Sequence, residues 1–404
     1  MIAAEAIYFL PFVIARIFRP TMLDIFAITN FELGLAFSAY GVVAMLAYFP
    51  GGPLADLFAP KMLMVIALLS TAVGGLLMAT IPGLPELRML YAYWGLTTVL
   101  LFWAAMIRAV RQLGGKHYSG SAFGLLDGGR GLVAAASASI AVMIYASLLP
   151  ADVESATMSE RSQAFQKMIL VFAGATAASS VLVWFVIPSQ GPAKDGERPT
   201  VTLVGAFAVL KLPAVWLQSI IIVCAYVAYK GLDDVSLYAK VALEFDEVDA
   251  AYSGTVSMWV RPFAAVAAGL IADRTRVSQM TAASFLVLAI GAGVIASGVL
   301  QAGMVAGFFV VIVATSAAVH ALRGLYFAIM QEGEIPLQYT GTVVGIVSTV
   351  GYTPDIFMGP LMGKLLDDSP GVLGHQHVFA VIAAFSMVGF VAALVFQRFV
   401  KSRI

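Results

Sequence analysis

The sequence predicts an all-α membrane protein with twelve transmembrane helices, arranged as two related bundles of six helices. Three observations predict this fold class. The 404 residues are 61% hydrophobic and 11% charged, with a mean hydropathy of +0.93, which is far more apolar than a soluble domain. The apolar runs are long enough to cross about 30 Å of hydrocarbon as helices. Short stretches of the first half also recur in the second half in the same order.

The first six helices are predicted from apolar runs that short polar or turn-forming stretches separate. The first run is expected to be a retained helix, because no basic segment or small-residue cleavage site precedes it. Strands of a membrane barrel would be shorter and would alternate in polarity, which these runs do not. The six helices are expected near residues 5–27, 33–52, 62–82, 89–110, 121–148 and 167–188.

A long polar break follows the sixth apolar run. Residues Pro188 to Thr200 hold three prolines, two glycines and four charged residues, a composition typical of a solvated linker. The next apolar runs predict helices near residues 209–238, 251–271, 280–300, 304–329, 341–364 and 377–398. The expected organisation is a first bundle at 1–188, a cytoplasmic linker at 189–208 and a second bundle at 209–404.

The distribution of basic residues predicts the orientation in the membrane. Lysines and arginines concentrate in the linker and at the span ends on the same side, including Lys61, Arg276 and Lys401. This side is expected to be cytoplasmic, with both termini on it, in the inner membrane of the cell. The 23 basic and 23 acidic residues balance, so nucleic acid is not an expected partner. A single cysteine, Cys224, excludes a disulfide framework.

Three pairs of short motifs indicate that the second half repeats the first. The stretch "GGPLADLFAPK", between the second and third expected helices, contains "GPLAD" at Gly52, which pairs with "GLIAD" at Gly269. "RAVR" at Arg108 pairs with "HALR" at His320. "YSGSAFG" and "YTGTVVG", which begin at residues 118 and 339, form the third pair. Three pairs in register predict a duplicated six-helix unit.

Twelve helices in two related halves, with G-x-x-x-D after the second and eighth helices, resemble the major facilitator superfamily. The resemblance covers essentially the whole chain. That family's loop motif usually continues with D-R-x-G-R-K, and this sequence departs from it by placing Leu57 after Asp56. The second copy keeps Asp273 followed by Arg274. The resemblance implies the major facilitator fold and transport by alternating access.

The same resemblance implies a gate at the cytoplasmic helix ends. Asp56 and Asp273, with Arg274, are expected to help to latch the two halves together, and a carboxylate near a helix start is favoured by the helix dipole. Arg111 and Arg323 are expected near the same inner end and join the gating set. The alternatives are that these aspartates solvate tight turns, and that the basic residues anchor the cytoplasmic surface or contact the substrate.

Ionisable residues at membrane depth predict the substrate class. Eleven residues into the first expected helix, at about 1.5 Å per residue, Arg16 is expected near the midplane. Shifting Arg16 by the separation of the two loop aspartates lands on Asp233, three residues after Lys230. Arg16 and Lys230 are therefore expected on opposite sides of a central cavity, where they would bind an anion. The pattern "KGLDDVSLY" resembles the organophosphate:phosphate antiporter branch.

Other polar groups are expected to assist in binding the substrate. Arg130 in "GLLDGGRG" could contact the anion directly, or could pair with Asp127 one turn earlier. Tyr229 and Tyr352 could bind substrate rings or hydroxyls, although aromatic side chains in helical bundles also serve packing.

Four residues are candidates for proton coupling. Asp355 follows Pro354 in a broken helix, and Asp233 and Asp234 lie beside Lys230. Each carboxylate could accept a proton or could neutralise a structural cation. His320 can change charge near neutral pH, but it could also be an ordinary hydrogen-bonded histidine. Arg261 in "WVRPF" is a further polar group at membrane depth.

These patterns predict a secondary transporter that moves a small organic anion, a carboxylate, phosphate or sulfonate, by alternating access. Proton symport and anion exchange are both compatible with the residues. No P-loop, metal-ligand spacing or nucleophile elbow is present, so neither an enzyme nor a cofactor or metal is expected. The alternatives are an efflux carrier for amphipathic compounds and a non-transporting membrane receptor or scaffold. The expected partners are the anion, protons or a counter-anion, and the lipid bilayer around a monomer.

Overall fold

The computed structural model describes residues 1–114, 119–188, 210–272, 275–300, 303–326, 328–333 and 340–401, and nearly all of them are helical. The first span is a chain of short pieces: α1 (Ile2–Ala6), the π-helical turn η1 (Phe9–Val13), α2 (Ile14–Ile17) and α3 (Arg19–Phe26). The rest of the first half comprises α4 (Asn30–Leu57), α5 (Pro60–Met78), α6 (Leu84–Gly95), η2 (Leu96–Trp103), α7 (Ala104–Gly114), α8 (Ser119–Leu148), the short turn η3 (Val153–Ser155) and α9 (Met158–Val186).

The second half repeats this plan. Its first span consists of α11 (Pro213–Gly231), the short 3-10 turn η4 (Leu232–Asp234) and α12 (Val235–Ala242). It continues with α13 (Glu247–Ala272), α14 (Val277–Ala296), α15 (Val305–Leu325), the turn η5 (Ala328–Gln331), α16 (Thr340–Gly351), α17 (Pro354–Asp368) and α18 (Val372–Lys401).

The prediction of twelve spans is confirmed. Ten helices in the described ranges are long and apolar enough to cross a membrane. The other two spans are the first, made of α1 to α3, and the eleventh, made of α16 and α17. Both are divided into shorter pieces, which explains why neither counts as one long helix. The predicted linker at 189–208 lies outside the described residues.

Two helices extend well beyond their predicted boundaries, α4 at its C-terminal end and α9 at its N-terminal end. α4 continues to Leu57 with Pro50 and Pro53 inside it, although "GGPLADLFAPK" predicts a break after residue 52. Such prolines are tolerated in membrane helices because neighbouring groups satisfy the freed carbonyls. α9 begins at Met158, nine residues before the predicted start, because Thr157 and Glu160 form a capping box that extends the helix beyond its apolar stretch.

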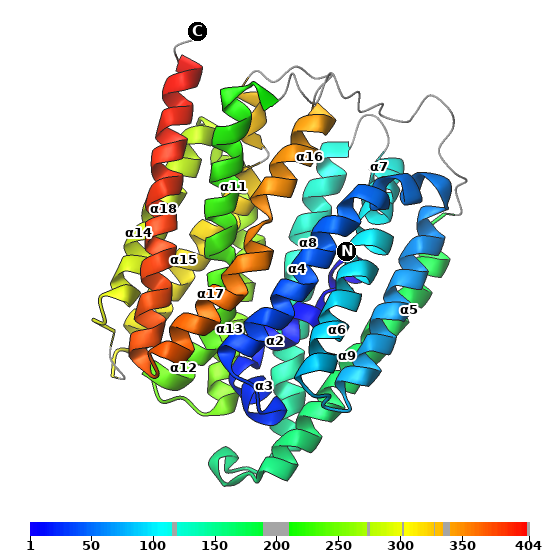
Figure 1. The fold of residues 1–404 in the computed structure, drawn as a ribbon, viewed down its shortest axis with the longest axis vertical. Helices are drawn as coiled ribbons and strands as arrows, with labels where there is room; N and C mark the ends of the chain where they lie inside the picture. The colour runs from blue at the N-terminus through cyan, green and yellow to red at the C-terminus, as the bar shows by residue number, and fades with distance from the viewer. Residues whose placement is uncertain are drawn as a thin grey trace.

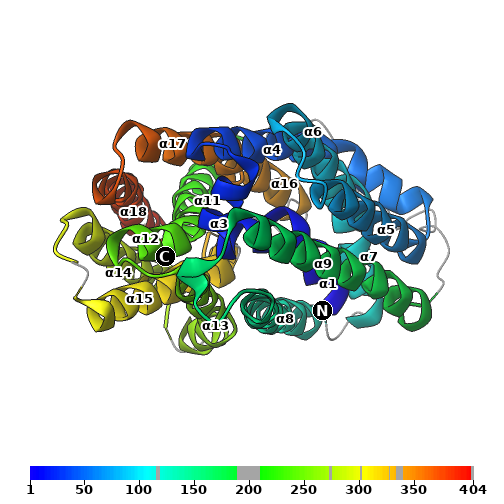
Figure 2. The ribbon, with the colours of Figure 1, turned by 90° about the horizontal axis from the view of Figure 1, so that it is seen from below.

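The two halves lie side by side and meet along two helix pairs. α4 packs along α17 and α8 packs along α13, and the view from below shows these pairs on opposite sides of the molecule (Figure 2). Gly34 of α4 lies so close to the backbone of Gly359 in α17 that a side chain at this position would clash with it. The first span and α11 lie between the two pairs, near the molecular centre (Figures 1 and 2).

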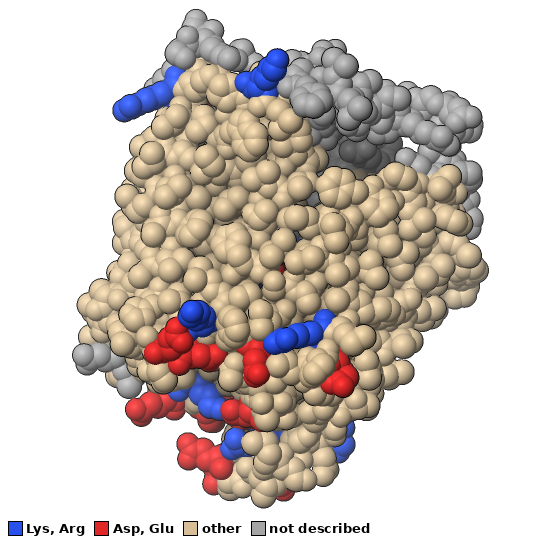
Figure 3. Space-filling view, viewed as in Figure 1, with Lys and Arg blue, Asp and Glu red and all other residues tan. Residues whose placement is uncertain are grey.

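The surface has the polarity that a membrane requires. Large apolar side chains are exposed on the lateral faces, for example Phe185 and Met89. The face in Figure 3 is almost free of charged side chains across its middle, and acidic and basic residues gather at the lower end, where α3 and α12 lie. This distribution matches an apolar belt in contact with lipid and a charged end in water.

Candidate functional site

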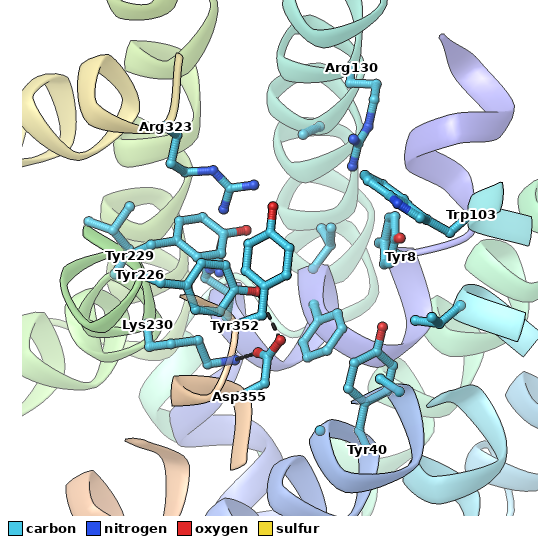
Figure 4. Close-up of a pocket in the computed structure, with 18 of the residues that line it drawn as sticks. Tyr8, Tyr40, Trp103, Arg130, Tyr226, Tyr229, Lys230, Arg323, Tyr352 and Asp355 are labelled. Atoms are coloured by element: carbon cyan, nitrogen blue, oxygen red, sulfur yellow. Dashed lines mark hydrogen bonds and ion pairs between the residues drawn. The ribbon is translucent and has the colours of Figure 1, made fainter. Parts of the chain in front are cut away.

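A cavity of about 130 Å³ lies between the two halves. Its walls come from the first, second, fourth and fifth spans of the first half and from the corresponding spans of the second half. The lining includes basic, acidic and aromatic side chains, which converge on one central space (Figure 4). The site is therefore shared between the two halves.

Proline breaks in two spans place polar backbone beside this cavity. Pro20 has no N–H to donate to the carbonyl of Arg16, and the hydroxyl of Ser236 in α12 donates to that oxygen instead, at 2.9 Å. Pro354 likewise cannot donate to the carbonyl of Val350, which accepts hydrogen bonds from the hydroxyl of Thr353 at 2.7 Å and from its backbone N–H at 3.2 Å. At each break a side-chain hydroxyl therefore donates a hydrogen bond to the carbonyl that the proline cannot reach. These hydrogen bonds allow the helix to be interrupted at membrane depth.

Arg16 and Lys230 line the cavity and share a carboxylate between them. Arg16 Nε lies 2.5 Å from Asp233 Oδ1, and Lys230 Nζ lies 3.5 Å from Asp233 Oδ2. Lys230 also lies 3.3 Å from Asp355 Oδ1, and the hydroxyl of Tyr226 donates to Asp355 Oδ2 at 3.0 Å. Two cations and two carboxylates therefore form one buried network, so the repulsion expected between Arg16 and Lys230 is offset inside the protein.

A second ionic group joins three other elements. Glu5 of α1 accepts a hydrogen bond from Arg130 Nε of α8 at 2.9 Å through Oε2. Its other oxygen, Oε1, accepts one from Arg261 Nη1 of α13 at 3.3 Å. All three residues line the cavity and are buried. Arg130 thus binds Glu5, whereas the side chain of its predicted alternative partner, Asp127, lies outside the description.

Arg323 completes the basic lining of the cavity and packs on aromatic rings. Its guanidinium lies 3.8 Å from the ring centroid of Tyr229, and Arg16 lies 4.6 Å from that centroid. Arg323 and Arg130 point from opposite sides toward the space above Tyr352 (Figure 4). The ring of Tyr352 packs against the rings of Tyr48 and Tyr226 beside this space.

Basic groups outnumber acidic groups around the cavity. Five lining side chains carry a positive charge: Arg16, Arg130, Lys230, Arg261 and Arg323. Among the described residues, two lining side chains are carboxylates, Glu5 and Asp355, and Asp233 adds a third from just behind the lining. Because opposite charges attract strongly in a medium of low dielectric constant, this arrangement favours an anionic guest.

The structure brings most of the predicted site residues together. Arg16, Arg130, Tyr229, Lys230, Tyr352, Asp355 and His320 all line the cavity. Asp233 lies directly behind it, and Arg323, which the sequence places in the inner gate, lines it as well.

The other predicted residues lie elsewhere. Asp234 faces away from the cavity, where its Oδ2 lies 2.6 Å from His375 Nδ1 of α18. Asp273 and Arg274 lie outside the described residues. Asp56 and Arg111 fall within α4 and α7, but their side chains are not described.

Glu5 is the site residue that sequence reasoning misses. It is the first residue of the first expected helix, and an acidic residue at a helix start is usually in contact with water. Arg261, by contrast, carries a detectable signal, because an arginine followed by proline inside an apolar run stands out. Tyr226, which donates to Asp355, is one of several aromatic residues at membrane depth that could bind substrate, and nothing in the sequence distinguishes it from the others.

Contacts between the halves also close one end of the molecule. Glu247 of α13 accepts hydrogen bonds from Tyr145 at 2.9 Å and from Arg161 at 3.0 Å, and both donors belong to the first half. Lys240 lies 3.3 Å from Asp24, which forms another ion pair between the halves. These residues lie near α3 and α12, at the lower end in Figure 1.

Comparison with known proteins places this architecture in a family. The chain is similar to the inner membrane protein YqcE of Escherichia coli (strain K12), with 27% identity over 393 residues, 95% of this chain and 90% of the relative. It is also similar to the inner membrane protein YihN of the same organism, with 23% identity over 414 residues, 98% of this chain and 93% of the relative.

Solved structures share the fold at low sequence identity. A variant of the nucleoside transporter NupG superposes with a TM-score of 0.76 at 13% identity, covering 98% of both chains. A bacterial homologue of the lysosomal transporter Spinster, in an inward-facing and unoccupied conformation, gives 0.71 at 12% identity, covering 98% of this chain and 96% of that one. The sequence profile of the Major Facilitator Superfamily matches residues 1–357. With most of its length matched by that profile, the chain belongs to the Major Facilitator Superfamily.

Proposed function

We propose that this protein is a secondary transporter that carries a small organic anion, a carboxylate, phosphate or sulfonate, by alternating access. The observation that carries the proposal is the excess of basic side chains around one buried cavity between the two halves. An empty cavity with such a lining is costly in a medium of low dielectric constant, and a bound anion would offset that cost.

Within this proposal the cations have different roles. Arg130 and Arg323 point into the same open space from opposite halves, so they are assigned to contact the anion directly. Arg16 and Lys230 are held by Asp233 and Asp355, so they set the charge of the wall and bind the anion when these carboxylates are displaced or protonated. Tyr229 and Tyr352 supply ring faces and hydroxyls to the organic part of the substrate.

The energy source is proposed to be an ion or substrate gradient. Asp355, Asp233, Asp234 and His320 remain the sequence-derived candidates for proton binding in a symporter, and anion exchange is the other possibility. Asp56, Asp273, Arg274 and Arg111 remain proposed gating residues on the linker side. The contacts of Glu247 and Lys240 support a state in which the opposite end is closed. The protein is proposed to act in the inner membrane, a location that the names of the inner membrane proteins YqcE and YihN support. It is further proposed to be a monomer with both termini in the cytoplasm, as the distribution of basic residues predicts.

A matched panel of charged and neutral compounds tests this function. Purified protein is heated with gluconate, glucose 6-phosphate and 2-hydroxyethanesulfonate, and with glucose and ethanediol as neutral counterparts. A ligand that binds the folded state stabilises it by about 2.7 kcal/mol at 100 times its Kd. We expect at least one anion to raise the unfolding temperature while its neutral counterpart does not. Equal responses to charged and neutral members would contradict the proposal.

The aromatic lining favours one rival, an efflux carrier for amphipathic compounds. Tyr8, Tyr40, Tyr48 and Trp103 supply much of the cavity wall, and such rings can bind apolar guests. This rival predicts that a hydrophobic cation such as tetraphenylphosphonium stabilises the protein and that replacing Arg323 by glutamine leaves this effect intact. A receptor or scaffold would show no substrate flux in proteoliposomes with any member of the panel.

A further inference from the structure

Glu5 is held in the cavity in a position that an anionic substrate could also occupy. Its side chain is 6% exposed, and each of its oxygens accepts a hydrogen bond from a different guanidinium. Arg130 belongs to the first half and Arg261 to the second half. The carboxylate of Glu5 therefore joins the two halves across the cavity, as a bound substrate carboxylate would.

Of the two described carboxylates that line the cavity, Glu5 is the one bound by guanidiniums of both halves. Asp355 is held by Lys230 and Tyr226, which both belong to α11. Guanidiniums that converge on one point repel each other unless an anion lies between them. In the absence of substrate, the carboxylate of Glu5 supplies this anion.

We propose that Glu5 is a resident counter-ion of the substrate site, which a substrate anion displaces from Arg130 and Arg261 and which then takes up a proton. This inference rests on the proposed function and adds the coupling residue to it. The proton comes from water on the open side of the cavity and forms an O–H bond on the carboxylate of Glu5. One negative charge and one proton enter together, so the charge of the site is unchanged and the protein works as a symporter.

The surroundings of Glu5 favour this exchange. Among the side chains that the structure describes, the charged and titratable groups that face it are Arg130, Arg261, the hydroxyl of Tyr8 and the amino group of Met1. α9 meets α1 through the uncharged Thr176, whose hydroxyl donates to the carbonyl of Ala6. Once a substrate anion takes the guanidiniums, a charged Glu5 would have a like charge beside it in a medium of low dielectric constant. Protonation removes that repulsion.

Rescue by a small carboxylate tests the resident counter-ion without knowledge of the substrate. We expect Glu5→Gln to leave the two guanidiniums without their shared carboxylate, so formate should bind there and raise the unfolding temperature of the variant. Half of the formate effect should occur at a concentration at least tenfold lower than for the wild type. The matched control is Glu86→Gln, which removes an exposed carboxylate at the start of α6 and should respond like the wild type.

Two further variants keep the test decisive. Glu5→Gln combined with Arg261→Gln removes one guanidinium of the pair and should lose the enhanced response to formate. Glu5→Asp keeps the charge on a shorter side chain and should respond at an intermediate concentration, which provides a reading if Glu5→Gln does not fold. A formate response equal to that of the wild type in the single variants, or one retained in full by the double variant, would overturn the inference.

Proton uptake tests the coupling step. The panel anion that stabilises the wild type most is added to weakly buffered purified protein, and a pH-indicator dye reports protons taken up per bound anion. We expect about one proton for the wild type and for Glu86→Gln, and none for Glu5→Gln with binding retained. Equal uptake in Glu5→Gln would overturn the role of Glu5, whereas a panel without any binding anion would contradict the proposed function and leave the formate result to decide on the counter-ion.

Discussion

The first and seventh spans occupy corresponding places in the two halves, yet they balance their charges differently. Each carries a basic residue at the cavity, Arg16 or Lys230, and each is interrupted shortly afterwards. The seventh span carries its own counter-ion, because Asp233 lies one turn after Lys230 in the same span. Arg16 has its ion pair with Asp233 of the other half.

This difference shows how charge and conformation are linked. When the halves separate at the closed end, Arg16 must exchange Asp233 for water or for substrate, whereas Lys230 keeps Asp233 beside it. Of the two ion pairs that Asp233 forms, the one with Arg16 crosses between the halves and must therefore break when they separate. A substrate anion that reaches Arg16 would lower the free-energy cost of breaking it.

Loss of the shared carboxylate should have the largest effect. Asp233→Asn leaves Arg16 and Lys230 buried with less compensation, and breaking a buried pair typically costs about 3–5 kcal/mol. We expect a large drop in the unfolding temperature of the purified protein. The matched control is Asp24→Asn, whose carboxylate is 46% exposed and pairs with Lys240, so its removal should cost at most about 1 kcal/mol. Similar decreases of the unfolding temperature in both variants would show that the buried ion pairs of Asp233 stabilise the protein no more than an exposed ion pair does.

Exchanging arginine and lysine should reduce transport more in the first span than in the seventh span. Arg16→Lys removes the guanidinium that contacts both Asp233 and the hydroxyl of Tyr229. A lysine ammonium cannot reproduce that fork, so uptake into proteoliposomes should fall about tenfold, equivalent to roughly 1.4 kcal/mol. Lys230→Arg keeps the charge beside its own aspartates and should retain more of the activity. The asymmetry would be refuted by equal losses, or by a larger loss in Lys230→Arg.

Removal of the hydroxyl that binds at the break in the first span should lower the stability of the protein by a smaller amount than Asp233→Asn does. Ser236→Ala leaves the carbonyl of Arg16, freed by Pro20, without its donor, at a cost of about 1 kcal/mol. Ser147→Ala is the control, because the Ser147 hydroxyl donates to a carbonyl in its own exposed helical turn. Thermal unfolding of both variants provides the comparison. A loss of stability in Ser147→Ala as large as that in Ser236→Ala would contradict this reading of the break.

Sequence reasoning predicts the fold well because the membrane imposes it. Apolar length sets the number of spans, and the expected depth of Arg16 and Lys230 predicts both beside a central cavity, which both of them line. The helix ends are less predictable, since Thr157 and Glu160 extend α9 by a local capping interaction that hydropathy does not register.

The ionic partners could not be predicted, because they depend on how the halves pack. The sequence shows Asp233 and Asp234 side by side, but the η4 turn directs one toward Arg16 and the other toward His375. Arg323 and Glu5 shift from expected end positions into the cavity wall for the same reason. Asp233 and Asp234, which are neighbours in sequence, thus have different ionic partners, whereas Glu5 and Arg323, which are far apart in sequence, line the same cavity.

Anion uptake by a double variant tests the central claim most directly. Arg130→Gln with Arg323→Gln removes the two guanidiniums that face each other across the open space, and Lys364→Gln removes an exposed cation of α17 as the control. The panel anion that stabilises the wild type most is radiolabelled and followed into proteoliposomes. We expect uptake to be abolished in the double variant and unchanged in Lys364→Gln. Uptake at the wild-type rate by the double variant would contradict an anion site between the two halves.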